Sequence, residues 1–216
     1  MFRRFPTLAL IGLLLASAAW LPAAAAASER QGGSVVVLMY HRFGEPAYPL
    51  TNTPLDLFER QLAMIADGGY RVLPLSEIAA ALESGEPLPE RSLAITIDDA
   101  YLSVYREAWP RLKAAGFPFT LFMASEPVDA GAEGFLSWAQ LREMAADPLV
   151  EIGSQTASHP HLPDVSDEQL AQEFNESNAR FNDEVGFVPQ LLSYPFGEFG
   201  IREKRAAEQA GFIAAF

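Results

Sequence analysis

The chain has 216 residues, half of them hydrophobic, and a formal net charge of −13 at pH 7. This length suits one domain with a sizeable core, and the composition excludes a disordered chain. The sequence contains no cysteine, so disulfides and thiolate chemistry are excluded and any metal must be bound by nitrogen and oxygen ligands.

The first 27 residues have the pattern of a signal peptide. Arg3 and Arg4 precede an uncharged apolar run at 8–20, and the alanines at 25–27 provide small residues for cleavage. The run is short for a membrane-spanning helix, and an uncleaved N-terminal membrane anchor is the alternative interpretation. In both cases we expect an exported protein, periplasmic or extracellular, with no transmembrane segment beyond this one.

Removal of residues 1–27 changes the charge further, because it takes away two basic residues and no acidic one. The mature chain then has a net charge of 13 − 28 = −15. Nucleic acids and anionic membrane surfaces attract basic patches, so neither is an expected partner. The acidity is compatible with a neutral or cationic substrate, and equally with a role in solubility alone.

Seven short apolar runs follow the signal segment and alternate with segments of helical periodicity. The runs are unbroken and rich in β-branched or aromatic residues, which is typical of buried parallel strands. They cover residues 35–39, 71–73, 93–97, 119–123, 149–152, 191–194 and 212–215.

Six helices are expected between these runs, and most have recognisable ends. Thr53 and Pro54 predict a cap and a first-turn proline, residues 166–169 predict a capping box, and Gly116 predicts a helix end. The remaining expected boundaries are Ser76, Ser137 and Gly211. Alternating strands and helices predict a parallel α/β sheet, with a doubly wound sheet as the alternative to a barrel.

Polar clusters directly follow four of the apolar runs, at residues 40–41, 98–99, 155–160 and 194–197. In a barrel of parallel strands, the carboxyl ends of all strands open onto one face, where active sites lie. The spread of the clusters over four strand ends therefore favours a closed or nearly closed barrel. Two carboxylates with one or two imidazoles at that face indicate metal-assisted hydrolysis.

Asp98 and Asp99 are the central pair among these clusters. Neighbouring residues of an extended strand point to opposite sides, but the chain turns at a strand end, so both side chains are expected to reach one pocket. The alternative is that Asp99 caps a helix beginning near Tyr101. Gln155 and His159 are four residues apart, and a single helical turn within a loop would place both on one face.

Four segments together resemble the ordered motifs of the polysaccharide deacetylase, or NodB-homology, family. They are AITIDDAY at 94–101, EIGSQTASHPHL at 151–162, YPFG at 194–197 and GFIAAF at 211–216. The resemblance implies one domain over residues 34–216. It also implies a distorted (β/α)7 barrel that removes acetyl groups from carbohydrates with a divalent metal, zinc first, with cobalt or nickel as alternatives.

The resemblance also implies a role for each matching residue. Asp98 is the expected general base, and Asp99 and His159 are the expected metal ligands. A backbone N–H near Phe196 would help to bind the developing oxyanion. His161 is either an alternative ligand or a residue at the rim that contacts substrate. The full set of expected substrate-binding residues is Tyr194, Pro195, Phe196, Gly197 and His161.

The chain departs from the family pattern in two places. Gln155 replaces the first metal histidine of the second motif, and its carboxamide oxygen is a weaker zinc ligand than imidazole. The late Leu-x-His motif, which supplies a general acid, is absent before Phe216, where a C-terminal truncation is one interpretation. Residues 39–43 (MYHRF) instead resemble the early histidine motif of exported poly-N-acetylglucosamine deacetylases. His41 is therefore the candidate acid, or alternatively a histidine hydrogen-bonded to a carboxylate.

The predicted function is hydrolysis of acetyl groups from an N-acetylglucosamine-containing glycan. An exopolysaccharide, peptidoglycan and a chitooligosaccharide are the candidate substrates. One alternative is a glycan-binding barrel without catalysis, which Gln155 favours, because fold alone does not guarantee activity. The other is hydrolysis of a non-sugar C–N amide bond. We expect a monomer with the carbohydrate substrate as its partner.

Overall fold

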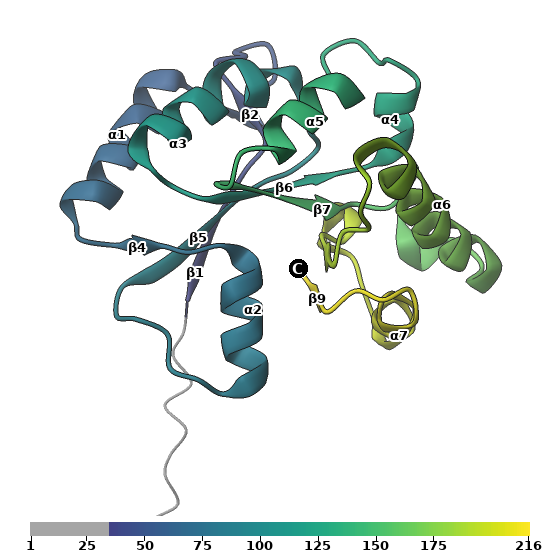
Figure 1. Cartoon of the computed structure of the whole chain (residues 1–216). Coiled ribbons are helices and arrows are strands. Elements are labelled where there is room, and N and C mark those ends of the chain that lie inside the picture. Colours follow the sequence, from purple (N-terminus) through teal and green to yellow (C-terminus); the bar gives the residue numbers. More distant parts are fainter. Residues whose placement is uncertain (1–34) are drawn as a thin grey trace, which may run out of the picture. The chain divides into compact units, whose positions relative to one another are not determined.

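The computed structural model describes residues 35–216, and the predicted signal peptide lies outside the described residues. A sheet of seven parallel strands lies at the centre (Figure 1). Each strand overlaps one of the apolar runs predicted from the sequence. The strands are β1 Val36–Tyr40, β4 Arg71–Val72, β5 Ser92–Ile97, β6 Phe119–Met123, β7 Val150–Ser154, β8 Leu191–Leu192 and β9 Ala214–Ala215.

The strand order β1-β5-β6-β7-β8-β9 curls the sheet into a half-barrel. Leu93 pairs with both β1 and β4, and Ile97 pairs with both β1 and β6, so β4 and β6 share one edge of β5. Within residues 35–216, no pairing joins β1 to β9. The predicted barrel fold is thus confirmed in an open form, in which the two end strands β1 and β9 do not pair with each other.

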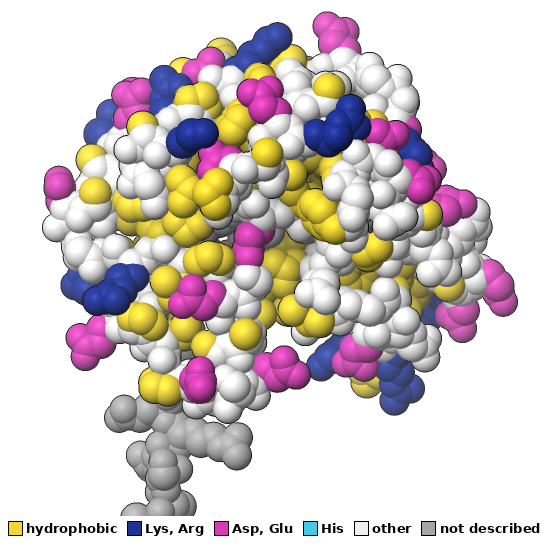
Figure 2. Space-filling view, in the orientation of Figure 1, with side chains coloured by type: hydrophobic (Ala, Val, Ile, Leu, Met, Phe, Trp, Pro, Cys, Tyr) yellow, Lys and Arg dark blue, Asp and Glu magenta, His cyan; other side chains and the backbone are white. Residues whose placement is uncertain are grey.

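Exposed apolar side chains flank the opening between β1 and β9. Val36 and Met39 of β1 are 60% and 63% exposed, and Phe216 beside β9 is 38% exposed. Figure 2 shows apolar side chains at the surface in the middle of the face seen in Figure 1. The inner side of the half-barrel is therefore accessible from this opening.

Seven α-helices occur in the described part of the chain, and six of them were expected. They are α1 Leu55–Asp67, α2 Leu75–Ser84, α3 Trp109–Ala115, α4 Ser125–Asp129, α5 Trp138–Ala145, α6 Asp167–Val185 and α7 Ile201–Gln209. A π-helical turn, η1 (Val104–Ala108), leads into α3. Helix α4 and the small sheet of β2 (Arg42–Phe43) and β3 (Asn52–Thr53) were not predicted.

Helix ends follow the predicted signals where the capping side chain is not engaged in other structure. Ser137 and Ser166 form the capping boxes of α5 and α6, and Gly116 ends α3 with φ +70°. The predicted cap of α1 is wrong. Pro54 occupies the cap position without a side-chain bond, because Thr53 pairs with Phe43 in the small sheet.

Helix α2 packs on the inner face of the sheet, unlike the helices along the outside (Figure 1). Its residues Leu75 and Ile78 are buried in a cluster with Ala94, Phe122 and Leu191. Burial of two large aliphatic side chains stabilises this position by about 3–6 kcal/mol before entropy costs. One end of the half-barrel is therefore occupied by a helix.

The N-terminus of α2 is capped by a strand residue. Ser76 was the predicted cap, but the cap position is Pro74, which has no side-chain bond. The carboxylate of Glu151 on β7 instead accepts hydrogen bonds from the N–H groups of Leu75 and Ser76, at 2.8 and 3.3 Å. It also accepts from the hydroxyls of Ser76 and Thr120. A carboxylate at a helix N-terminus is favoured by the helix dipole.

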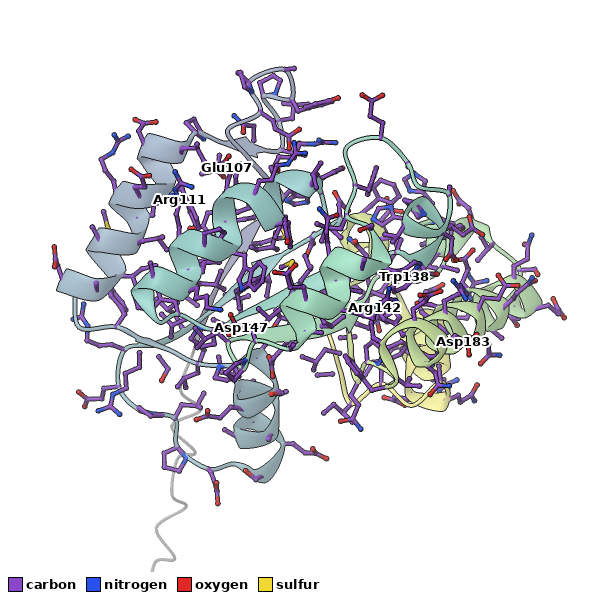
Figure 3. The ribbon with its side chains drawn as sticks, turned by 45° about the horizontal axis from the view of Figure 1, so that its top comes forward. Glu107, Arg111, Trp138, Arg142, Asp147 and Asp183 are labelled. Atoms are coloured by element: carbon purple, nitrogen blue, oxygen red, sulfur yellow. The ribbon has the colours of Figure 1, made fainter. Side chains whose placement is uncertain are left out.

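The outer helices are connected by ion pairs at the surface. Arg111 of α3 contacts Glu59 of α1 at 3.0 Å as well as Glu107, one turn earlier, at 2.9 Å, and Arg142 of α5 contacts Glu184 of α6 at 2.9 Å. Figure 3 places Glu107, Arg111 and Arg142 on these outer helices. Exposed pairs of this kind contribute about 0–1 kcal/mol each, so the fold depends mainly on the buried core.

Candidate active site

A cavity of about 890 Å³ lies at the carboxyl ends of the strands and brings together most of the predicted site residues. Those that line it are His41, Asp98, Asp99, Gln155, His159, Tyr194, Phe196 and Gly197. Other polar residues of the lining are Thr51, Thr96, Tyr101 and Ser193, and large apolar ones are Met39, Phe122, Phe135 and Phe216. The four polar clusters thus meet at one face, as predicted.

Asp98 is the more buried carboxylate of the central pair. Its side chain is 5% exposed and accepts a hydrogen bond from the hydroxyl of Ser193 at 3.3 Å. Burial and the adjacent Asp99 carboxylate raise the pKa of Asp98 to about 7, against the smaller effect of the Ser193 hydroxyl. Asp98 is therefore a carboxyl group that can exchange a proton near neutral pH.

A left-handed turn directs Asp99 into the same cavity. Asp99 and Ala100 have φ values of +71° and +51°, which non-glycine residues rarely adopt. The following helix begins at Leu102, and within the described residues no N–H group donates to the Asp99 carboxylate, so Asp99 does not cap it. Strained backbone of this kind is common at functional sites, where surrounding structure enforces it.

Gln155 and His159 lie beside Asp99, although not through the predicted helical turn. Thr156 and His159 have φ values of +70° and +61°, and the His159 N–H donates to the Thr156 hydroxyl at 3.1 Å. The expected turn is therefore a bend. The Gln155 carboxamide oxygen accepts a hydrogen bond from the Asp99 N–H at 3.3 Å.

The imidazole of His159 faces the carboxylate of Asp99. His159 Nε2 is 3.7 Å from Asp99 Oδ1. Burial lowers the pKa of His159 below its ordinary value, and the attraction of Asp99 opposes this effect only in part. The neutral imidazole is the form that binds metal ions.

The third motif forms another wall of the cavity. Phe196 has φ +60°, and its N–H makes no hydrogen bond within the described residues. Pro195 is buried below this wall and does not line the cavity, and neither does His161. The His161 ring instead stacks on Phe196 with centroids 4.0 Å apart, and its Nδ1 is 2.8 Å from Glu198.

Sequence reasoning missed Ser193 and Tyr101 as site residues. Ser193 follows β8 directly, and its position after a strand is the signal that identified the other polar site residues. Tyr101 contacts the guanidinium of Arg42 on its ring face at 3.3 Å and packs against Phe135. No sequence signal connects Tyr101 to Arg42, because the two residues belong to different elements.

The donor atoms fit a divalent cation, but not a tight zinc site. Ligand oxygens and nitrogens lie about 2.0–2.2 Å from zinc, so the 3.7 Å between Asp99 and His159 allows both to bind one ion. The third candidate, Gln155, is a neutral carboxamide. Among the described residues, no group of three His, Cys, Asp or Glu side chains is placed to bind a metal. Water would have to complete the coordination.

Comparison with known proteins decides the family. A family model described as polysaccharide deacetylase matches residues 85–215, more than half of the chain. The chain belongs to the polysaccharide deacetylase family. Members of this family are hydrolases that act on acetylated carbohydrates, and they are generally metal-dependent. The family predicted from the motifs is thus confirmed.

Two relatives illustrate the range of similarity. YxkH of Bacillus subtilis (strain 168), which carries the name of a polysaccharide deacetylase, is 29% identical over 176 residues, or 82% of this chain and 61% of that protein. The poly-β-1,6-N-acetyl-D-glucosamine N-deacetylase of Escherichia coli (strain K12) is 33% identical over 109 residues, or 44% of this chain and 16% of that protein. The chain therefore spans less than two thirds of either relative.

Solved structures agree with the half-barrel architecture. IcaB from Ammonifex degensii is 28% identical with a TM-score of 0.76, and the match covers 84% of this chain and 82% of that one. The deacetylase PplD of Streptococcus pyogenes, in complex with acetate, is 23% identical with a TM-score of 0.76, covering 83% and 81%. At 23% identity, the similarity to PplD shows the fold alone.

Within residues 35–216, no helix has both the length and the apolar character needed to cross a membrane. The longest helix is α6, which is amphipathic and rich in polar residues. The predicted signal peptide or anchor at residues 1–27 lies outside the described residues.

Proposed function

We propose that this family member is an exported, metal-dependent hydrolase that removes acetyl groups from an N-acetylglucosamine-containing polysaccharide or oligosaccharide. The observation that supports this most is the single cavity shared by two carboxylates and two imidazoles, Asp98, Asp99, His41 and His159. An amide is a poor electrophile, so its hydrolysis needs a base, an acid and electrophilic assistance together.

Asp98 is the general base in this proposal. Its raised pKa lets the carboxylate accept a proton from the attacking water near neutral pH. The hydroxyl of Ser193 donates to the Asp98 carboxylate and orients it. Because Asp98 is almost fully buried, its charge is poorly solvated, which makes the carboxylate a stronger base than one in water.

Asp99, His159 and Gln155 would bind the divalent cation, with zinc as the first candidate and cobalt or nickel as alternatives. When bound, the cation would polarise the acetyl carbonyl and acidify the attacking water. Gln155 has its carboxamide oxygen directed to the Asp99 N–H, which orients the Asp99 backbone. The weak third ligand predicts lower zinc affinity than a site with two histidines.

His41 and Phe196 complete the reaction centre. His41 follows β1 and lines the cavity, so it is placed to protonate the leaving amine. The Phe196 N–H would donate to the oxyanion that forms on the acetyl group. Tyr194, Phe196 and Gly197 would form the wall against the sugar, while Pro195 supports it from below and His161 lies at the rim beside Phe196.

The substrate class is inferred from the relatives. The name of the Escherichia coli relative favours a β-1,6-linked polymer, and peptidoglycan and chitooligosaccharides are the other candidates. The signal segment at residues 1–27 supports a periplasmic or extracellular location. The acidic surface would not repel a partly deacetylated, cationic product. We further expect a monomer.

The test is acetate release from acetylated glucosamine polymers, with and without added Zn²⁺, Co²⁺ or Ni²⁺. Asp98→Asn should lower turnover by about 10²–10⁴-fold, the range for loss of a general base. Asp67→Asn is the matched control, because Asp67 is exposed at the end of α1 and does not line the cavity. Full activity in Asp98→Asn would refute the assignment of the base.

A second function is favoured by Gln155. If the weakened ligand set binds no metal, the barrel would be a glycan-binding module. Retained glycan binding without acetate release at any metal concentration, from the folded protein, would support this alternative over catalysis. Stoichiometric metal together with metal-dependent acetate release would reject it.

A further inference from the structure

We propose that Glu173 on α6 is a positioning residue for His159. This inference rests on the proposed function only in that His159 belongs to the reaction centre. Glu173 does not line the cavity. It acts through the loop of residues 155–159, which follows β7 and ends at His159.

The carboxylate of Glu173 accepts three hydrogen bonds from this loop. One oxygen accepts from the N–H groups of Ala157 and Ser158, at 3.0 and 2.8 Å. The other accepts from the hydroxyl of Ser158 at 2.5 Å. Ala157 is 1% exposed, so without Glu173 its N–H would be left buried and unbonded.

The loop needs such support because its backbone is strained. Thr156 and His159 both have positive φ, in a region that side chains other than glycine rarely occupy. Such conformations persist only where the surrounding structure enforces them. Glu173 bonds to the two residues between these positions, so it fixes the part of the loop that joins them.

The opposite side of the loop is bound by the first residues of α4. The N–H groups of Ser125 and Glu126 donate to the carbonyl oxygens of Thr156 and Ala157, at 3.3 and 2.9 Å. The loop is therefore held between α4 and α6. Only the α6 side depends on one side chain, and a single substitution can remove it.

The orientation of His159 depends on this loop. Its ring lies 3.7 Å from Asp99 and contacts the ring of Phe196, with centroids 4.7 Å apart. A relaxed loop would move the imidazole away from both neighbours. Loss of an indirect partner of this kind typically lowers metal affinity or activity by about 10–100-fold.

The test compares three variants of one helix. Glu173→Ala removes all three bonds, whereas Glu173→Gln keeps an oxygen for the two N–H groups and an amide that donates to the Ser158 hydroxyl. Glu176→Ala is the matched control, because Glu176 is exposed on α6 and, among the described residues, its side chain hydrogen-bonds to Gln172 alone. Each variant is studied as the full mature chain.

The primary measurement is the NMR spectrum of the chain labelled at its three histidines, recorded metal-free at one pH. Glu173→Ala should shift the His159 ring signals and leave those of His41 unchanged, and Glu173→Gln should restore them. In the acetate assay, turnover should fall about 10–100-fold in Glu173→Ala and recover in Glu173→Gln.

Two results would overturn the proposal. One is an unchanged His159 signal in Glu173→Ala, and the other is an equal shift in Glu176→Ala. If Glu173→Ala does not fold, Ser158→Ala removes one of the three bonds and should give a smaller shift of the same signal. Since the spectrum requires neither metal nor turnover, it distinguishes failure of this inference from failure of the proposed function.

Discussion

Replacement of the buried base should stabilise the protein while it lowers its activity. Asp98 has a pKa raised from its ordinary 3.8 to about 7 in the folded state. Between pH 3.8 and about 7, Asp98 is ionised in the unfolded chain and neutral in the folded protein. Folding therefore loses stability as the pH rises from 3.8, and the cost is complete above about pH 7. Asp98→Asn removes this cost, because asparagine is neutral at every pH.

The size of the effect follows from the pKa difference. A rise from 3.8 to about 7 corresponds to about 4 kcal/mol at 1.36 kcal/mol per pKa unit. Relaxation around the charge makes this an upper limit, so we expect a gain of about 2–4 kcal/mol at pH 8. For a domain of this size, that gain raises Tm by about 4–16 °C. At pH 4 the gain should be close to zero.

The assay is urea and thermal denaturation of both proteins at pH 4 and pH 8, with a chelator present so that no cation compensates the charge. Asp129→Asn is a control of opposite sign. A hydrogen bond from Arg180 holds the pKa of Asp129 below its ordinary value, so this variant should lose stability at pH 8. An Asp98→Asn protein that is no more stable at pH 8, or equally stabilised at both pH values, would refute the reasoning.

Three further predictions concern single side chains. Glu151→Ala should lower the free energy of unfolding by about 2–3 kcal/mol, since two partly buried N–H groups of α2 lose a charged acceptor. Urea denaturation, with the exposed Glu83→Ala as control, measures this. Ser193→Ala should move the acidic limb of the kcat/KM profile to higher pH, because the Ser193 hydroxyl lowers the pKa of Asp98 and its removal lets that pKa rise. A limb that does not move would contradict this prediction. Gln155→His should tighten zinc binding, as measured by competition with a chromogenic chelator, and equal affinity would mean that residue 155 is not a ligand.

Much of the fold was predictable because buried parallel strands have a strong sequence signal. All seven apolar runs became strands, and the polar clusters after them met in one cavity. The capping box at Ser166 and the helix start at Ser137 were also correct, because each depends on atoms only three residues apart. Local chemistry is thus enough where the interacting groups are close in the chain.

The errors occurred where distant groups decide local structure. Ser76 was expected to cap α2, but the N–H groups of its first turn are bonded by the carboxylate of Glu151, which lies on the distant strand β7. Residues 155–159 were expected to form a helical turn, but bonds to Glu173 and α4 stabilise left-handed conformations instead. His161 was expected either as an alternative ligand or at the rim, and its contacts with Glu198 and Phe196, outside the cavity lining, likewise come from residues distant in the chain. No pattern in the sequence indicates such partners.

The capping of α2 by β7 has a consequence for biosynthesis. Leu75 and Ser76 lie 76 and 75 residues before Glu151. At 5–20 residues per second, a ribosome needs about 4–15 s to make this stretch. During that interval the ten residues of α2 are too few to form a stable helix alone, and their N-terminal N–H groups lack the Glu151 acceptor. The closed end of the barrel therefore forms only after β7 has been synthesised, and a nascent chain stalled before residue 151 should be a preferred target for chaperones and proteases.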